Sequence, residues 1–318
     1  MEYKVLAYYR IGSLDDPQAE VARHKEFLSR LDFKCRIYIS EQGINGQASG
    51  RADHADEYMA WMRSDERFKE MPFKVHRAEE HVFPKMTVKY RKQLVALDCE
   101  VDFSLAGEHI SPEEWKKRMA ERDKDTLILD VRNDYEWKIG RFEGSELPPL
   151  ETFREFPAYA KKLKEERDPK TTSVMMYCTG GIRCEFFSAL MKKEGFEKVV
   201  QLDGGVIHYG LKEGSDHWEG KLFVFDDRLA VPMGEKVGPI SDCVHCGKPN
   251  DVYYNCANMD CNELFLCCPD CLKMHQGCCS SDCSQQERIR PYQESARPFR
   301  KWGYEEKLAW KNGSPLHN

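Results

Sequence analysis

Apolar and polar residues alternate with two different periods along the first 98 residues. Runs in which every second residue is apolar or β-branched predict strands, and longer stretches with apolar residues three or four positions apart predict helices. The expected strands are 3–9, 35–40, 73–77 and 86–90, and the expected helices are 17–31 and 52–69. Residues 41–50 are rich in glycine and asparagine, so we expect a structured loop there. The predicted order, β-α-β-α-β-β, is compatible with a ferredoxin-like α+β sandwich.

The pattern changes after a predicted connector at 99–110. Ser111 and Pro112 have the residue types of a helix N-cap and first helical position. Continuous apolar runs at 126–132, 174–177 and 198–202 are typical of parallel strands that are covered on both faces. Because these runs alternate with helical stretches, residues 99–225 are predicted to form an open parallel α/β domain. A turn is expected at 140–144.

Residues 226–318 differ in composition. Ten of the fourteen cysteines fall between Cys243 and Cys283. The N-terminal residues lack a signal-peptide layout, so clustered cysteines are expected to be metal ligands before disulfides. Two CxxC pairs about twenty residues apart have the ligand spacing of a zinc ribbon. The predicted ligand set is Cys243, Cys246, Cys268 and Cys271, with a second set of Cys256, Cys261, Cys279 and Cys283 and with His245 and His275 as alternates. A reduced or partly disulfide-linked cysteine cluster is the rival interpretation.

Composition and charge limit the partners. Hydrophobic residues make up 41% and charged residues 32% of the 318 residues, and no apolar run reaches the roughly 18 residues of a membrane span. We therefore expect a cytoplasmic protein without membrane contact. The net charge of −6 means that nucleic acid would need a local basic face. Residues 74–92 and the tail after Cys283, which mixes basic and aromatic side chains, are the candidates; a lysine-protected sheet edge and a tail packed on the body are the plain alternatives.

The strongest candidate for chemistry is Cys178. It follows an apolar strand and precedes a glycine-rich turn and a helix, an arrangement that recurs in presenting nucleophiles. Loop amides and a helix start favour an anion, which lowers a thiol pKa. Only four residues separate Cys178 from Arg183, one fewer than in cysteine phosphatases, which favours a sulfur or a small anion. The predicted loop is Thr179, Gly180, Gly181, Ile182 and Arg183. A buried structural cysteine is the alternative.

Other residues are expected near this loop because ligands bind at the carboxyl ends of parallel strands. Asp130 and Arg132 end one predicted strand, and Gly204 and Gly205 follow another, so one shared pocket is expected. Cys184 is interpreted either as a resolving thiol or as a helix residue packed in the core.

Several motifs together carry a family resemblance. Residues 130–136, the Cys178 loop and 202–206 resemble a rhodanese domain. Residues 41–46, 153–157 and 178–185 and the cysteine pattern are similar to the tRNA uridine 5-hydroxylase family, the UPF0176 group, over nearly the whole chain. The fold class is therefore α/β: a central rhodanese-like open parallel sheet (99–225), an N-terminal ferredoxin-like α+β domain (1–98) and a C-terminal Cys-rich module (226–318). One departure is Gly140-Arg141-Phe142, where rhodanese-like domains usually have Gly-His.

The resemblance implies oxygen-dependent 5-hydroxylation of the wobble uridine of tRNA, with Cys178 matching the essential cysteine of the family. tRNA is then the partner and molecular oxygen the co-substrate, and no flavin, haem, iron or nucleotide motif is visible. The alternatives are a sulfurtransferase that carries a persulfide on Cys178, which needs only the central domain, and a non-catalytic RNA-binding protein. The sequence leaves the oligomeric state open.

Overall fold

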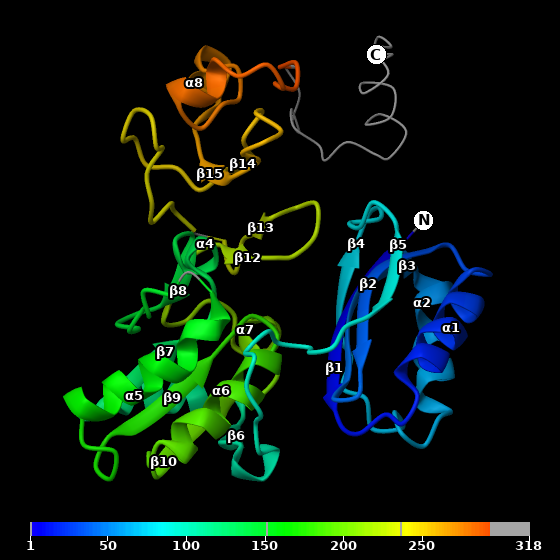
Figure 1. Ribbon diagram of the computed structural model, residues 1–318, viewed down its shortest axis with the longest axis vertical. Helices are drawn as coiled ribbons and strands as arrows, with labels where there is room; N and C mark the ends of the chain where they lie inside the picture. Colours follow the sequence, from blue (N-terminus) through cyan, green and yellow to red (C-terminus); the bar gives the residue numbers. More distant parts are fainter. Residues whose placement is uncertain (1, 151, 236, 293–318) are drawn as a thin grey trace. The chain divides into compact units, whose positions relative to one another are not determined.

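The computed structural model describes residues 2–150, 152–235 and 237–292, and the chain divides into two compact units, 1–237 and 238–318 (Figure 1). The first unit contains both the predicted N-terminal and central domains. Most of the predicted basic and aromatic tail lies outside the described residues.

The N-terminal half of the first unit is a five-stranded sheet with two helices on one face (Figure 1). Helices α1 (Pro17–Leu28) and α2 (Ala52–Arg63) pack against it. The first four strands are antiparallel, and β5 pairs parallel with β2. This arrangement confirms the predicted ferredoxin-like fold. The strands lie in the order β4 (Lys74–Ala78), β1 (Tyr3–Ile11), β3 (Gly43–Arg51), β2 (Phe33–Ser40), β5 (Met86–Tyr90).

The loop predicted at 41–50 is wrong, because most of it forms β3 in the middle of the sheet. Its glycines are required by packing: a Cβ on Gly46 would lie 2.2 Å from the Cζ atom of Tyr8, and one on Gly50 would lie 2.5 Å from the ring of Phe33. Pairing with β1 on one edge and β2 on the other outweighs the low strand propensity of glycine and asparagine. The true order is β-α-β-β-α-β-β.

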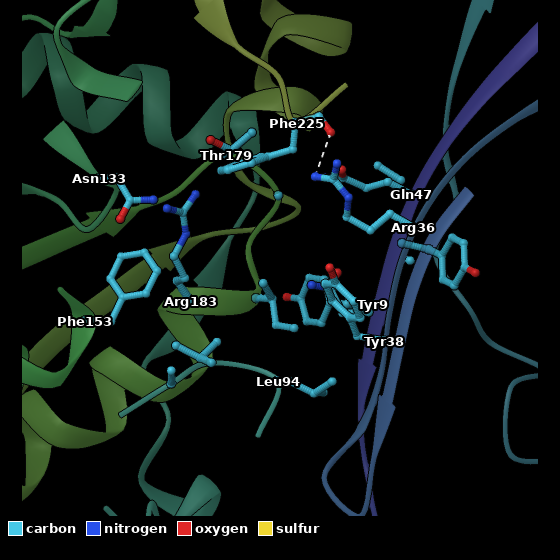
Figure 2. Close-up of a pocket in the computed structure, with 18 of the residues that line it drawn as sticks. Tyr9, Arg36, Tyr38, Gln47, Leu94, Asn133, Phe153, Thr179, Arg183 and Phe225 are labelled. Atoms are coloured by element: carbon cyan, nitrogen blue, oxygen red, sulfur yellow. Dashed lines mark hydrogen bonds between the residues drawn. The ribbon is translucent and has the colours of Figure 1, made fainter. Parts of the chain in front are cut away.

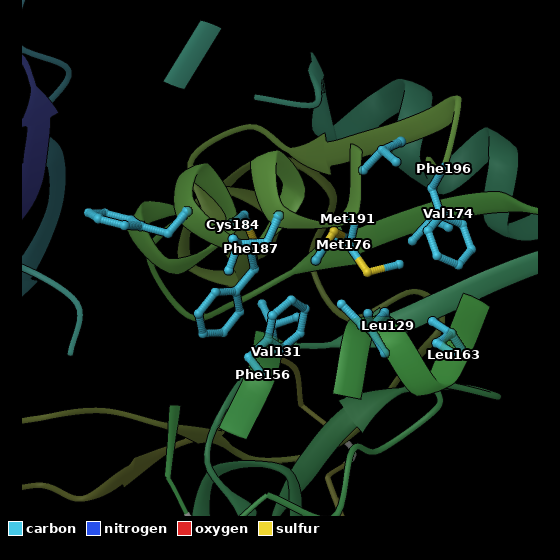
Figure 3. Close-up of a cluster of buried hydrophobic side chains, with 14 of the residues drawn as sticks. Leu129, Val131, Phe156, Leu163, Val174, Met176, Cys184, Phe187, Met191 and Phe196 are labelled. Atoms are coloured by element: carbon cyan, nitrogen blue, oxygen red, sulfur yellow. The ribbon is translucent and has the colours of Figure 1, made fainter. Parts of the chain in front are cut away.

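The central domain is the predicted parallel sheet. Alternate side chains of its strands enter two different cores, so both faces are buried. One core lies between the sheet and helices α5 (Phe156–Glu166) and α6 (Ile182–Lys193), as Figure 3 shows for Met176 and Phe187. The other lies under α3 (Pro112–Glu121) and α7 (Gly205–Glu213). The strand order is β6 (Glu108–Ile110), β10 (Lys198–Leu202), β9 (Ser173–Tyr177), β7 (Thr126–Asp130).

Two local predictions in this domain were only partly right. The connector 99–110 contains the short helix η1 (Phe103–Leu105) and strand β6, which pairs with β10. The expected turn at 140–144 begins with β8 (Gly140–Phe142), which pairs with β11 (Trp218–Gly220). Three-residue strands show no alternation in sequence, and their partners lie far along the chain. Helix α4 (Asp134–Trp137), the turn η2 (Phe153–Glu155) and the two-stranded β12 (Leu222–Phe223) and β13 (Ala230–Val231) complete the unit.

The described part of the second unit is small and built around its cysteines. It has a two-stranded sheet, β14 (Tyr253–Asn255) and β15 (Leu264–Leu266), and helices α8 (Pro269–Met274) and α9 (Ser281–Ser284). Its buried core is mostly cysteine with a few apolar residues such as Phe265 and Leu272. Among the residues that the structure describes, no helix has the length and apolarity needed to cross a bilayer.

Candidate active site and metal centres

The Cys178 loop is held in shape by backbone contacts with the start of α7. The amides of Val206 and Ile207 donate to the carbonyl oxygens of Cys178 and Thr179, each at 3.0 Å. Gly205 has a φ of +67°, and a Cβ there would lie 2.5 Å from the carbonyl oxygen of Cys178. Only glycine fits at such a close approach. The glycine at position 205 therefore packs against the backbone of the Cys178 loop, while neither Gly204 nor Gly205 lines the cavity described below.

The structure favours a thiolate at Cys178. The amide of Gly181 donates to its Sγ atom at 3.1 Å. Burial alone would raise the pKa of Cys178, but hydrogen bonds from the Cys184 thiol and from the amides of residues 183 and 184, with the charge of Arg183, lower it to about 5. Cys184 is itself fully buried, and burial and the neighbouring Cys178 raise its pKa well above the usual range. Cys184 is therefore a neutral donor in the core beside the sulfur.

Arg183 is fixed by a carboxylate that sequence reasoning did not assign to the site. Its Nη2 atom donates to Oε1 of Glu136 at 2.8 Å, and the Thr179 hydroxyl donates to the same oxygen at 2.6 Å. Burial would raise the pKa of Glu136, but Arg183 lowers it, so the carboxyl is ionised. Glu136 also closes the capping box of α4 with Asn133. That Asn-x-x-Glu spacing was the available signal.

Asp130 and Arg132 form a separate buried pair. Arg132 donates to Asp130 through Nε at 2.8 Å and Nη2 at 2.6 Å, and the Tyr177 hydroxyl donates to Asp130 at 2.7 Å. Arg132 also donates to the carbonyl oxygen of Gly140 at 2.6 Å. Neither charged side chain lines the cavity described next. Their ion pair and hydrogen bonds connect the end of β7 with β8 and β9 inside the protein.

A cavity of about 370 Å³ lies between the N-terminal sheet and the Cys178 loop (Figure 2). Thr179, Gly180, Ile182 and Arg183 form one wall, while the side chain of Cys178 is fully buried behind them. The opposite wall comes from β1, β2 and β3. The lining combines aromatic rings, side-chain amides and cations: Tyr9, Tyr38, Phe153, Phe225, Asn45, Gln47, Asn133, Arg36, Lys74 and Arg183.

The N-terminal domain contacts the loop directly. The Tyr9 hydroxyl donates to Oε1 of Glu185 at 2.8 Å, and Nζ of Lys74 donates to the carbonyl oxygen of Gly180 at 2.8 Å. Burial lowers the pKa of Lys74 to about 8, against the opposing effect of the Cys178 charge. Sequence reasoning placed Lys74 in a basic strand but did not connect it or Tyr9 with Cys178. No sequence signal marks them, because the contact joins separate domains.

The C-terminal module contains two groups of four cysteines whose sulfurs lie within 4.8 Å of one another. They are the two predicted sets, Cys243, Cys246, Cys268 and Cys271, and Cys256, Cys261, Cys279 and Cys283. The Sγ atoms of Cys246 and Cys268 lie 3.8 Å apart, close to the roughly 3.8 Å expected between sulfurs of a tetrahedral zinc site with Zn–S bonds of about 2.3 Å. All fourteen cysteines are free thiols, so the disulfide alternative is not found.

The alternates His245 and His275 belong to neither cysteine set and instead stack on each other at 3.8 Å. Four thiolates fill the tetrahedral coordination of zinc and leave no position for a substrate. Both groups therefore fit a structural metal such as zinc rather than a catalytic one.

Three family models match successive parts of the chain. Residues 3–94 match the family described as "UPF0176 acylphosphatase like domain", residues 111–209 match "Rhodanese-like domain", and residues 219–284 match "Rhodanase C-terminal". A protein of Chlamydia pneumoniae named tRNA uridine(34) hydroxylase is 56% identical over 305 residues, 94% of each chain. The chain belongs to the tRNA uridine(34) hydroxylase family. A second member, from Protochlamydia amoebophila, is 56% identical over 300 residues, 93% of each chain.

Several solved structures resemble part of this tRNA uridine(34) hydroxylase family chain. The rhodanese-like domain of the Anabaena protein Alr3790 is 20% identical, covering 40% of this chain and 86% of its own, with a TM-score of 0.30. Such a likeness is too low to bear on function. The family assignment therefore rests on the full-length relatives, which confirms the resemblance found in the sequence motifs.

Proposed function

We propose that this protein hydroxylates C5 of the wobble uridine of tRNA, with Cys178 as the reacting sulfur. The observation that carries the proposal is the low-pKa thiolate placed directly behind a cavity that two domains build together. The name of the relatives, tRNA uridine(34) hydroxylase, supplies the substrate class. A tRNA substrate also agrees with a cytoplasmic protein.

The cavity has the chemistry to hold a flipped pyrimidine nucleotide. Enzymes that modify a base extrude it into a pocket that stacks it on aromatic rings and reads its edge with hydrogen bonds. Phe153 and Phe225 offer rings, Gln47 and Asn133 offer amides for the uracil edge, and Arg36 offers a charge for a phosphate. Its volume of about 370 Å³ lies within the usual range of small-molecule sites.

The proposed reaction starts with attack of the Cys178 thiolate on C6 of uracil, which forms a C–S bond and moves an electron pair to C5. C5 then adds molecular oxygen and takes up a proton, giving a hydroperoxide. Two equivalents of a small thiol supply two electrons and two protons and become one disulfide, and this transfer reduces the hydroperoxide to a C5 hydroxyl and one water. Loss of the C5 proton and cleavage of the C–S bond regenerate the thiolate. The loop amides and Arg183 hold the sulfur anion at the first and last steps.

The test uses purified protein, a small thiol as the reductant and tRNA that lacks the modification. Nucleoside mass spectrometry should detect 5-hydroxyuridine with the wild type in air, and neither with Cys178→Ser nor without oxygen. Cys99→Ser, which changes a half-buried cysteine outside the loop, is the matched control and should retain activity. Unchanged 5-hydroxyuridine with Cys178→Ser would reject the proposal.

A second candidate function is transfer of sulfur from a Cys178 persulfide. The short loop between Cys178 and Arg183 and the lowered thiol pKa favour it. A thiosulfate:cyanide assay measures this activity directly. The second candidate does not explain why Tyr9 and Lys74 of another domain contact the loop. We therefore rank hydroxylation first.

A further inference from the structure

The face of the N-terminal sheet opposite α1 and α2 continues the wall of the cavity toward an exposed sheet edge. Residues paired across neighbouring strands present their side chains on the same face. Tyr9 of β1 pairs with Asn45 of β3, Asn45 with Tyr38 of β2, and Tyr38 with Lys89 of β5. These four residues form one row across four strands. With strands about 4.8 Å apart, the row spans roughly 14 Å from the Cys178 loop to the edge strand.

The beginning and the middle of this row belong to the candidate site. Tyr9 contacts Glu185 beside the Cys178 loop, and Tyr38 and Asn45 line the cavity, where Figure 2 shows Tyr38 near Tyr9 and Arg36. The guanidinium of Arg91 lies 4.9 Å from the centre of the Tyr38 ring. The Tyr38 ring therefore lies between the cavity and the cation of Arg91.

The end of the row carries uncompensated positive charge. Lys89, Arg91 and Lys92 are exposed, and none of them forms an ion pair within the described part of the chain. Elsewhere in this domain, by contrast, Arg23 and Arg67 are both paired with carboxylates. The edge cations are thus available for an anionic partner, although the whole chain has a net charge of −6.

We propose that this row, Tyr9–Asn45–Tyr38–Lys89 with Arg91, is the track on which the single-stranded nucleotides next to the target uridine of the tRNA anticodon loop lie. The track rests on the proposed function, since it takes its occupant from the tRNA substrate. Single-stranded RNA is recognised by stacking on sheet aromatics, and four-stranded sheets commonly stack two or three bases. Tyr38 stacks on a base next to the target uridine. Lys89 and Arg91 contact the phosphates of the nucleotides that extend out of the cavity.

The experiment measures binding of an anticodon stem–loop RNA with uridine at the wobble position to the full-length protein at several salt concentrations. Tyr38→Ala should weaken binding roughly 5- to 150-fold, the range expected for loss of one base stack. Tyr38→Phe keeps the aromatic ring and should bind as the wild type does. The double variant Lys89→Ala, Arg91→Ala should lower the slope of log affinity against log salt by about 1.4, since each phosphate contact in a single strand contributes about 0.7.

Lys25→Ala is the matched control, because Lys25 is an exposed cation on α1, on the other face of the sheet. It should bind as the wild type does. The track is rejected if either Tyr38→Ala or the double variant has wild-type affinity and salt slope. If the track is rejected but the wild type still makes 5-hydroxyuridine, the proposed function is retained without the track. If both variants lose binding but the wild type makes no 5-hydroxyuridine, the track stands as an RNA surface and the proposed reaction fails.

Discussion

The Cys184 thiol offers the sharpest test of how the Cys178 thiolate is stabilised. Cys184→Ala removes the side-chain donor to Cys178 but leaves the amides and Arg183 in place. A hydrogen bond to an ionised group contributes about 1.5–3 kcal/mol. One pH unit corresponds to about 1.36 kcal/mol, so the pKa of Cys178 should rise by about 1 to 2 pH units. The wild-type pKa is about 5.

The sign follows from which form each donor favours. Donors to the thiolate lower the folded-state pKa, so the reactive anion is present above about pH 5 in the wild type and appears only at higher pH in Cys184→Ala. The assay is the pH dependence of alkylation of the Cys178 peptide, quantified by mass spectrometry after brief iodoacetamide treatment. The absolute rate is low because Cys178 is buried, but the midpoint is independent of that rate.

Two controls separate this effect from general damage. Cys184→Ser keeps a donor and should keep most of the lowered midpoint, and Cys99→Ala should leave it unchanged. Thermal unfolding reports any loss of core packing at position 184. A midpoint in Cys184→Ala equal to that of the wild type would refute the assignment of Cys184 as a donor and leave the loop amides and Arg183 as the stabilising groups.

Three further predictions concern the residues that support the Cys178 loop and the two cysteine groups. Glu136→Gln leaves the Arg183 charge buried without its partner and should lower the free energy of unfolding in urea by about 3–5 kcal/mol, whereas Glu114→Gln, which breaks an exposed pair, should lower it by about 1 kcal/mol or less. Equal losses would contradict this reasoning. Gly205→Ala forces its Cβ against the Cys178 loop and should reduce 5-hydroxyuridine formation at least tenfold, whereas Gly195→Ala, also at positive φ but with open space around it, should cost only backbone strain of about 1–2 kcal/mol. Similar activity in both variants would argue against the close approach. Plasma mass spectrometry should find about two zinc ions per chain, falling to one in Cys246→Ser, since each ion needs four thiolates; an unchanged zinc content would rule out the first ligand set.

The sequence predicted those elements correctly whose structure depends on residues a few positions apart. The strand, turn and helix around Cys178 follow from an apolar run, two glycines and a helical pattern, and they are observed as β9, the loop and α6. The start of α3 follows from Ser111 and Pro112, and the Ser111 side chain does accept from the amide of Glu114. The two cysteine groups follow from short spacings, because a CxxC turn places both sulfurs on one side of an ion.

Sequence patterns failed where a distant partner decides the outcome. Gly46 and Gly50 have low strand propensity, yet β3 is the centre of a sheet because two neighbouring strands satisfy its backbone and large rings fill the space above its glycines. Asp130 and Arg132 were expected near the pocket because of their place at a strand end. Their mutual hydrogen bonds, which sequence position does not reveal, keep them in the interior.

The sequence by itself determined the strand, loop and helix around Cys178 and the two groups of four cysteines, because each depends on residues a few positions apart. Only the tertiary structure decided how the site is completed. Glu136 lies 47 positions from Arg183, and Lys74 lies 106 positions from Gly180, so chain folding alone brings these groups together. Glu136 holds Arg183, whose charge lowers the pKa of Cys178, and Lys74 lines the cavity. Such interactions depend on distance in space, which a linear sequence does not contain.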